Sequence, residues 1–428
     1  MTDTSAEAVE GSTGRPPRWR RLVADTTPLR ESADYRRWWF GYSVSFTGTQ
    51  LTQFAVPFQV YKLTHSSLAV GAVGLVVLVP LVTMGLLGGA IADSTDRRRL
   101  TLLTSSVLFV LAAALTVQAA LDLRQVWLLY VIAAVQGAFS AIDSSARGAI
   151  LPRLVRRELM PAANALGQLG FNTGLSAGPL LGGLLIGTVG FGWTYALDAA
   201  SFLAVLYAIW RLPAMPPEGG GSKAGIASVV EGLRFLGPRK NLLMTFLVDI
   251  NAMVFGMPRA LFPAIGTTWF HGGAGTVGLL AAAPSVGALL GAATSGWATH
   301  VRRQGLAVLV SVMVWGGSIA VFGFTRVLWL ALLLLAVAGA ADMVSAIFRN
   351  TILQVATPDA LRGRLQGVFI VVVTGGPRLG DFEAGSVGSA FGSQVSVISG
   401  GVACMVGVAA LAVTYPSFAR YDAHDPVP

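Results

Sequence analysis

Ionisable side chains inside long apolar segments are the residues of this chain best placed to do chemistry. A charge at the centre of a bilayer costs roughly 2.5–3.5 kcal/mol on insertion scales, so such a residue is a functional candidate by default. Five acids in or near these segments are candidates for carrying a proton: Asp143, Asp249, Asp342, Asp381 and Glu383. Four bases are their candidate charge partners: Arg147, Arg259, Arg349 and Arg378. For each acid alone, a structural salt bridge or a helix cap explains its presence equally well.

Spacing along the chain indicates which of these charges meet. Asp143 and Arg147 are four residues apart and share one helix face, although Arg147 is close enough to a span end to reach the interface instead. Arg378 and Asp381 are three apart and are expected to pair. They lie in a Gly- and Pro-rich stretch, 375–385, which predicts a broken helix that is buried or lines a cavity. Three roles are open for this stretch. A hinge is the favoured interpretation, and a coupling site and a substrate contact are the alternatives.

Polar and aromatic residues of the same segments could contact a bound molecule. They are Tyr42, Gln50, Gln53, Phe54 and Asn251. For each of them, interhelical hydrogen bonding or core packing is the more common role.

Composition sets the class of protein that must position these residues. Of 428 residues, 54% are hydrophobic and only 12% are charged, against roughly 25% in soluble globular proteins. A soluble enzyme, a disordered chain and a disulfide scaffold are therefore excluded, the last because Cys404 is the single cysteine. The four histidines lack metal-ligand spacing, and no P-loop or catalytic cluster is visible. We expect no enzymatic activity, no metal and no cofactor.

Hydropathy predicts an all-α membrane protein with twelve transmembrane helices. At about 25 residues per span and loop, the chain has room for this number. The expected spans are 38–60, 68–92, 99–121, 126–150, 160–189, 192–211, 241–266, 275–299, 305–325, 327–350, 364–391 and 394–415.

The net charge of +9 is explained by membrane orientation rather than by a nucleic-acid partner. Most Lys and Arg residues fall in the two tails and in alternate loops, and such loops are cytoplasmic by the positive-inside rule. We therefore expect a multi-pass protein of the plasma membrane with both termini in the cytoplasm. The expected divisions are a tail (1–37), a six-helix lobe (38–211), a linker (212–240), a second six-helix lobe (241–415) and a tail (416–428).

An internal repeat supports two pseudo-symmetric lobes. The pair Val70-Gly71 matches Val277-Gly278 with an offset of 207 residues. The stretch 146–151 resembles 348–353 with an offset of 202 residues, aligning Arg147 with Arg349. Parallel repeats of this kind are the plan of the major facilitator superfamily.

Two motifs strengthen the resemblance to that superfamily. The stretch 89–99 resembles its cytoplasmic loop signature, with Ser94 and Asp96 as departures, and the matching residues are Gly89, Asp93, Asp96, Arg97, Arg98 and Arg99. The resemblance implies that Asp93 contacts a base or a helix N-terminus across the lobe interface. The second motif is a full match to Gly-x-x-x-Gly-Pro-x-x-Gly-Gly, which marks antiporting exporters of the superfamily, and its residues are Gly174, Gly178, Pro179, Gly182 and Gly183.

Further stretches over most of residues 35–415 resemble the enterobactin-exporter branch of the superfamily, including 151–155, 162–166 and 351–354. The resemblance implies a monomeric, proton-driven exporter of a siderophore, a drug or another amphipathic small molecule. It also implies that helices one, four, seven and ten line the cavity. Acids on three of these helices suit cations or neutral amphiphiles as substrates. An importer or uniporter on the same fold is the alternative, and a membrane enzyme or a non-transporting receptor is a remote one.

Overall fold

The structure is a computed structural model of the whole chain, and it describes residues 25–216, 231, 233–357 and 359–422. Much of the two expected tails and of the linker lies outside these residues. Over the described residues the chain is helical apart from short loops, and one isolated β-bridge joins Arg303 to Asp422.

The first lobe contains six long helices, as expected from hydropathy. A short helix, α1 (Thr27–Glu31), precedes them. The six are α2 (Ala33–Thr64), α3 (Ser67–Ser94), α4 (Arg97–Ala120), α5 (Val126–Leu154), α6 (Met160–Thr188) and α7 (Gly190–Trp210). Side-chain caps start three of them, because Ser32, Ser66 and Asp96 accept hydrogen bonds from the backbone N–H three residues on.

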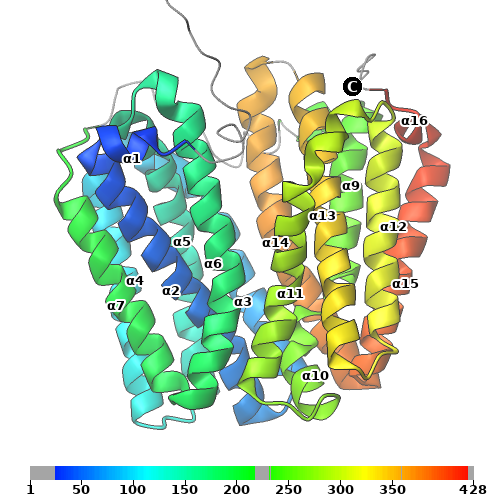
Figure 1. Cartoon of the computed structure of the whole chain (residues 1–428), viewed down its shortest axis with the longest axis horizontal. Coiled ribbons are helices and arrows are strands. Elements are labelled where there is room, and N and C mark those ends of the chain that lie inside the picture. The colour runs from blue at the N-terminus through cyan, green and yellow to red at the C-terminus, as the bar shows by residue number, and fades with distance from the viewer. Residues whose placement is uncertain (1–24, 217–230, 232, 358, 423–428) are drawn as a thin grey trace, which may run out of the picture.

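The second lobe repeats this plan. Its helices are α9 (Lys240–Phe255), α10 (Phe262–Thr268), α11 (Ala274–Ala293), α12 (Gln304–Phe322), α13 (Leu328–Ala356), α14 (Asp359–Phe391), α15 (Ser393–Thr414) and the short α16 (Pro416–Ala419). The pair α9 and α10 occupies the place of a single seventh span. Figure 1 shows the two lobes side by side, the first running from blue to green and the second from green to red.

The outer surface of both lobes suits a bilayer. On α4, Leu103, Val110 and Val117 recur every seven residues and are at least 55% exposed. On α15, Val406 and Val413 are similarly exposed. Ten helical segments among the described residues are long and apolar enough to cross a membrane. The helices α2 and α14 are not among these ten, because they carry the polar residues described below.

The broken helix expected in the eleventh span is wrong. The helix α14 continues unbroken through Pro377, which membrane helices tolerate when neighbouring helices support the backbone. The break lies in the seventh span instead, where α9 ends at Gly256 and a 3₁₀ turn, η3 (Arg259–Leu261), precedes α10. The Trp315 indole N–H on α12 donates to the Gly256 carbonyl oxygen at 2.7 Å and satisfies the opened backbone.

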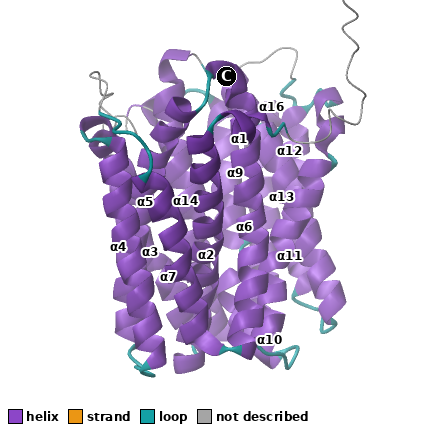
Figure 2. Cartoon of the chain, turned by 60° about the vertical axis from the view of Figure 1, so that its left-hand side comes forward, coloured by secondary structure: helices purple, strands orange, loops and turns teal. Residues whose placement is uncertain are grey.

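Both described ends of the chain lie at the same end of the bundle. Figures 1 and 2 show α1 and α16 together there, and α10 at the other end. We call these the terminus-bearing end and the opposite end. The inter-lobe helix pairs that meet closely are α3 with α14 and α6 with α11.

Candidate functional site

Two glycine-on-glycine crossings hold the lobes together near the opposite end. On α3, a methyl group at Gly71 would lie 2.6 Å from the Asp381 carbonyl oxygen, and one at Gly385 of α14 would lie 3.0 Å from Gly71 Cα. On α6, a methyl group at Gly183 would lie 3.0 Å from the Cα of Gly278 on α11. Only glycine allows the backbones to approach this closely. The lobes are therefore sealed to each other at this end.

The internal repeat relates the two crossings. Gly71 and Gly278 are 207 residues apart, and Gly183 and Gly385 are 202 apart, the same offsets as in the repeat. Residues 376–385 consequently form a partial second copy of the exporter motif, with Asp381 in the place of Pro179 and Ala384 in the place of Gly182. This equivalence explains the glycines of the eleventh span better than a broken helix does.

The exporter motif itself has two packing faces. Gly174, Gly178 and Gly182 share one face of α6, and side chains added there would clash with α2. The α2 residues that fill this glycine face are Phe46, Gln50 and Phe54. Gly183 points instead to the second lobe. The motif thus fixes α6 against its own lobe and against the partner lobe at once.

Three cavities follow α2, and Gln53 lines all three. Cavities 1 and 2 include residues of both lobes, whereas the residues of cavity 3 all come from the first lobe. Cavity 1 lies at the seal and has a volume of about 170 Å³. Cavity 2 is smaller, about 90 Å³. Cavity 3, about 380 Å³, includes Trp38 and Leu151 and so lies towards the terminus-bearing end. The three cavities thus succeed one another along α2, from the glycine crossings towards the terminus-bearing end.

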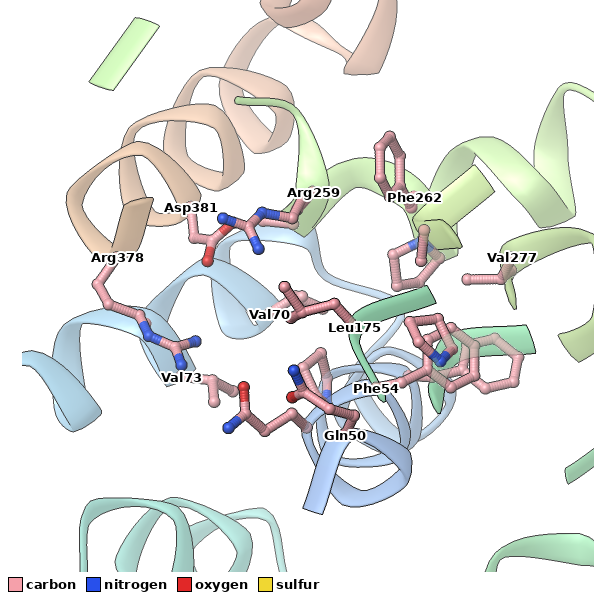
Figure 3. Close-up of a pocket in the computed structure, with 18 of the residues that line it drawn as sticks. Gln50, Phe54, Val70, Val73, Leu175, Arg259, Phe262, Val277, Arg378 and Asp381 are labelled. Atoms are coloured by element: carbon pink, nitrogen blue, oxygen red, sulfur yellow. The ribbon is translucent and has the colours of Figure 1, made fainter. Parts of the chain in front are cut away.

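Cavity 1 is built by both lobes and contains three charged side chains. Gln50, Gln53 and Phe54 come from α2, whereas Arg259, Arg378 and Asp381 come from η3 and α14. Figure 3 shows the Asp381 carboxylate beside Arg259, while Arg378 extends towards Val73.

The expected pair between Arg378 and Asp381 does not form. Among the described residues neither Arg259 nor Arg378 has a hydrogen bond or an ion pair within 4 Å, and Asp381 Oδ1 has no hydrogen-bond partner. The side chains diverge because Asp381 turns towards the 3₁₀ turn of the broken seventh span. Spacing along α14 could not reveal this, since that turn comes from another part of the chain.

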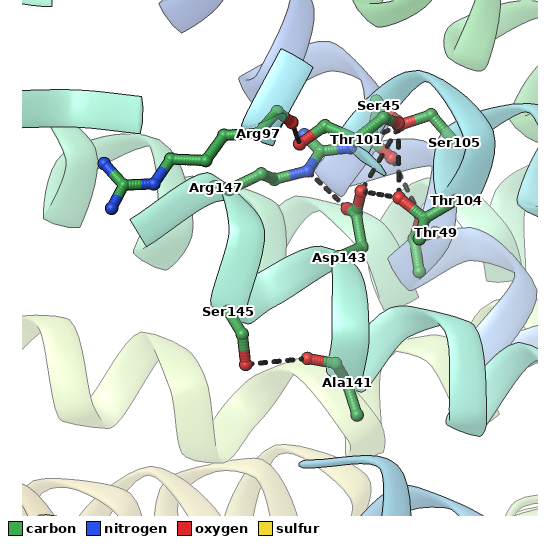
Figure 4. A network of polar contacts seen from close by, with 10 residues as sticks. All are labelled: Ser45, Thr49, Arg97, Thr101, Thr104, Ser105, Ala141, Asp143, Ser145 and Arg147. Carbon is green, nitrogen blue, oxygen red and sulfur yellow. Dashed lines mark hydrogen bonds and ion pairs between the residues drawn. The ribbon is translucent and has the colours of Figure 1, made fainter. Parts of the chain in front are cut away.

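Cavity 3 contains the predicted pair of Asp143 and Arg147. The two form a buried ion pair on α5, and Asp143 also accepts a hydrogen bond from Thr104 at 2.6 Å. Arg147 donates to Ser105 at 3.1 Å and lies over the Tyr42 ring, 5.0 Å from its centroid. Figure 4 shows this network between α2, α4 and α5. With its carboxylate fully engaged, Asp143 acts as a structural partner of Arg147.

The second lobe has an equivalent arginine with different partners. Arg349 on α13 forms a buried ion pair with Asp249 on α9 and a longer one, 3.5 Å, with Asp342. The Asp249 side chain is 5% exposed and that of Asp342 is 31% exposed. Two carboxylates therefore share one guanidinium group, and Asp342 is the more weakly held and the more accessible of the two.

The loop motif at the terminus-bearing end is anchored within its own lobe. Asp96 caps α4 and accepts a hydrogen bond from the Met215 backbone N–H at 2.9 Å. Arg97 donates to the carbonyl oxygen of Ala149 on α5, and Arg98 donates to the last carbonyl oxygens of α7. Arg99 is exposed. Gly88, next to the predicted Gly89, is the glycine that packs closely on α5.

The contact that was expected from Asp93 across the lobe interface is not formed in this conformation, and among the described residues Asp93 has no hydrogen bond or ion pair. This agrees with lobes that are separated at the terminus-bearing end. Asp93 is free to make such a contact when that end closes.

Several predicted residues line none of the three cavities, namely Asn251, Glu383, Asp249, Asp342 and Arg349. Asn251 donates to the Cys404 carbonyl oxygen at 2.9 Å and packs α9 on α15. Asp198, an intramembrane acid that was not among the proton candidates, accepts a hydrogen bond at 2.5 Å from Thr52 of α2, which lines cavity 2. Asp198 lies on α7 and is fully buried. Its position in an apolar span was the available signal for this contact.

Comparisons with known proteins agree with this geometry. Residues 23–427 match the family described as transmembrane secretion effector. The enterobactin exporter EntS of Citrobacter koseri is 30% identical over 407 residues, which cover 94% of this chain and 96% of that protein. A nucleoside transporter, a variant of NupG, superposes with a TM-score of 0.70 at 14% identity, covering 90% of this chain and 99% of that one. A POT family transporter in complex with 5-aminolevulinic acid superposes with a TM-score of 0.72 at 13% identity, covering 90% and 97%.

The structural likeness at these low identities establishes the shared fold. The family match covers nearly the whole chain, and the similarity to the exporter extends over both lobes. The chain therefore belongs to the transmembrane secretion effector family and is a multi-pass membrane transporter of the major facilitator type, similar to enterobactin exporters.

Proposed function

We propose that this transporter is a proton-driven exporter of a siderophore, a drug or another amphipathic small molecule. The similarity to an enterobactin exporter over 94% of the chain supports the direction and the class of substrate. The exporter motif supports it further, because Pro179 and Gly183 of the motif form one of the two close contacts between the lobes. We assign the terminus-bearing end to the cytoplasm, where most of the basic residues gather. The structure then corresponds to a state that is open to the cytoplasm.

The proposed proton coupling rests on the two ion pairs that Arg349 forms with Asp249 and Asp342. A carboxylate that binds and releases a proton during each cycle must be reachable by water and must gain or lose its charge partner. Asp342 meets both conditions better than Asp249, because it is more exposed and its ion pair is longer. We therefore propose that Asp342 carries the proton and that Asp249 holds Arg349 in place.

Efflux from cells that express the chain tests this function. Cells loaded with enterobactin, or with a neutral fluorescent amphiphile, should lose it faster than control cells, and a protonophore should stop this loss. In Asp342→Asn the rate of efflux should no longer depend on the proton gradient. Asp122→Asn, in an exposed loop at the opposite end, should leave the rate of efflux unchanged. Efflux that ignores the protonophore would indicate a uniporter, and accumulation of substrate would indicate an importer. Either result would overturn the proposal.

A further inference from the structure

We propose that cavity 1 binds the anionic group of an aromatic amphiphile, with Arg259 and Arg378 as its ligands. The inference rests on the proposed transport function and names the substrate class of that pathway. The charged side chains that line this cavity are two guanidinium groups and one carboxylate, so it carries a net positive charge. It differs in this from cavity 3, where Asp143 and Arg147 neutralise each other.

The two arginines have unused hydrogen-bonding capacity. Each guanidinium group carries five N–H donors, and among the described residues those of Arg259 and Arg378 meet no acceptor. Asp381 lies beside Arg259 but forms no ion pair with it. Asp342 forms its ion pair with Arg349 and does not line the cavity. Arg259 is exposed and Arg378 is half-buried, so both guanidinium groups are accessible to a bound molecule. A bound carboxylate or phenolate would pair with them through short, charge-assisted hydrogen bonds.

The rest of the lining suits an aromatic ring. Phe54, Phe58 and Phe262 line the cavity, and Gln50 adds an amide. In Figure 3, Arg378 and the Gln50 amide face the same central space, with Arg259 above it. At about 170 Å³ the cavity accommodates an acidic group and one ring system. The remainder of a larger substrate would extend past Gln53 into cavities 2 and 3.

The break in the seventh span makes this arrangement possible. An unbroken helix would continue the axis of α9, whereas the turn at Gly256 and Pro258 starts a new segment and brings Arg259 to the lobe interface. The acids on the expected cavity helices predicted cations or neutral amphiphiles as substrates. The structure pairs Asp143 and Asp249 with arginines of their own lobes, which leaves the cationic groups of cavity 1 for the substrate.

An anionic substrate also agrees with the proposed energetics. Export of an anion and entry of a proton both move positive charge inwards. A membrane potential that is negative inside drives both movements, by about 2.3 kcal/mol per charge per 100 mV.

Binding to the purified transporter tests the inference independently of transport. The probes are three ligands of nearly equal shape, namely 1-naphthoate, 1-naphthamide and 1-naphthylmethylamine, which differ in charge. Isothermal titration calorimetry on protein in nanodiscs should show naphthoate binding at least tenfold more tightly than naphthamide, and the amine binding most weakly. Arg378→Gln and Arg259→Gln should each remove most of this preference, and Asp381→Asn should strengthen it. Arg124→Gln, which removes an exposed loop arginine, should change nothing.

The opposite signs expected for Arg378→Gln and Asp381→Asn separate a loss of charge from a loss of folding. Equal binding of naphthoate and naphthamide would overturn the inference. A preference for naphthoate that survives both arginine substitutions would also overturn it, because the anion would then bind elsewhere. Failure of the proposed export would have a different signature, since the preference for naphthoate would persist while gradient-driven efflux of enterobactin was absent.

Discussion

At the scale of single residues, the two lobes use equivalent arginines differently. Arg147 and Arg349 occupy matching places on α5 and α13, and each faces the first long helix of its lobe. That helix offers the Tyr42 ring in the first lobe and the Asp249 carboxylate in the second. The first lobe therefore holds its arginine in a closed, neutral network, whereas the second holds it between two acids. This difference is the reason that we place the proposed proton exchange in the second lobe.

Arg147→Gln should destabilise the transporter. The substitution leaves Asp143 buried, with an exposed fraction of 6%, and without its charge partner. Breaking a buried ion pair on one side costs about 3–5 kcal/mol. Thermal unfolding followed by tryptophan fluorescence should show a lower midpoint. The double substitution with Asp143→Asn should recover part of the loss, and a double variant no better than the single one would contradict the pairing.

Asp342→Asn should leave folding nearly intact and remove proton release. If substrate binding displaces the proton carried by Asp342, enterobactin added to weakly buffered wild-type protein should acidify the solution. The Asn variant should bind the substrate without this change. Asp249→Asn should instead lower the unfolding midpoint, because Asp249 is the buried partner of Arg349. Proton release that persists in Asp342→Asn would assign the proton to another acid.

At the scale of helices, the glycine crossings decide which end of the pathway is shut. The crossings of α3 with α14 and of α6 with α11 are related by the internal repeat, so both seals lie near the opposite end. To open that end, the lobes must separate Gly71 from Gly385 and Gly183 from Gly278. If transport proceeds by rocking of one lobe against the other, these two backbone contacts are the ones that must separate.

Gly278→Leu should prevent closure of the opposite end. The added side chain would begin 2.5 Å from the Pro179 carbonyl oxygen, which neither helix can accommodate without moving apart. In a Cys404→Ala background, a cysteine introduced by Val70→Cys in cavity 1 should become reactive to an impermeant maleimide applied from outside. Gly275→Leu is the matched control, because nothing lies within 4 Å of that position. Equal labelling of the two variants would contradict the role of the seal.

At the scale of the whole molecule, the distribution of charge predicts the orientation in the membrane. The terminus-bearing end holds the arginines of the loop before α4 and those of the loop after α5, and the opposite end holds few bases. The positive-inside rule then predicts that both termini lie in the cytoplasm.

Cysteine labelling in whole cells can check this orientation. In the Cys404→Ala background, Asp122→Cys lies in the exposed loop after α4 and should react with an impermeant maleimide. Ser417→Cys, exposed in α16, should react only after the cells are permeabilised. The reverse pattern would invert the proposed direction of transport as well as the topology.

The sequence by itself determined the features that depend on local composition. Twelve spans follow from apolar length, because each helix must satisfy its own backbone in lipid. The pairing of Asp143 with Arg147 follows from helical periodicity, and the exporter motif is readable as small residues at helical spacing.

Only the tertiary structure decided which charges meet between helices. Asp381 turns to Arg259 rather than to Arg378, Asn251 packs on α15, and Asp342 competes with Asp249 for one arginine. The tertiary structure also decided where a helix is interrupted. The seventh span breaks at Gly256, whose carbonyl oxygen accepts a hydrogen bond from Trp315. The eleventh span continues as a helix through Pro377. The physical reason is the same throughout. In a protein with few charges, the position of each depends on side chains from distant parts of the chain, which spacing along one helix does not encode.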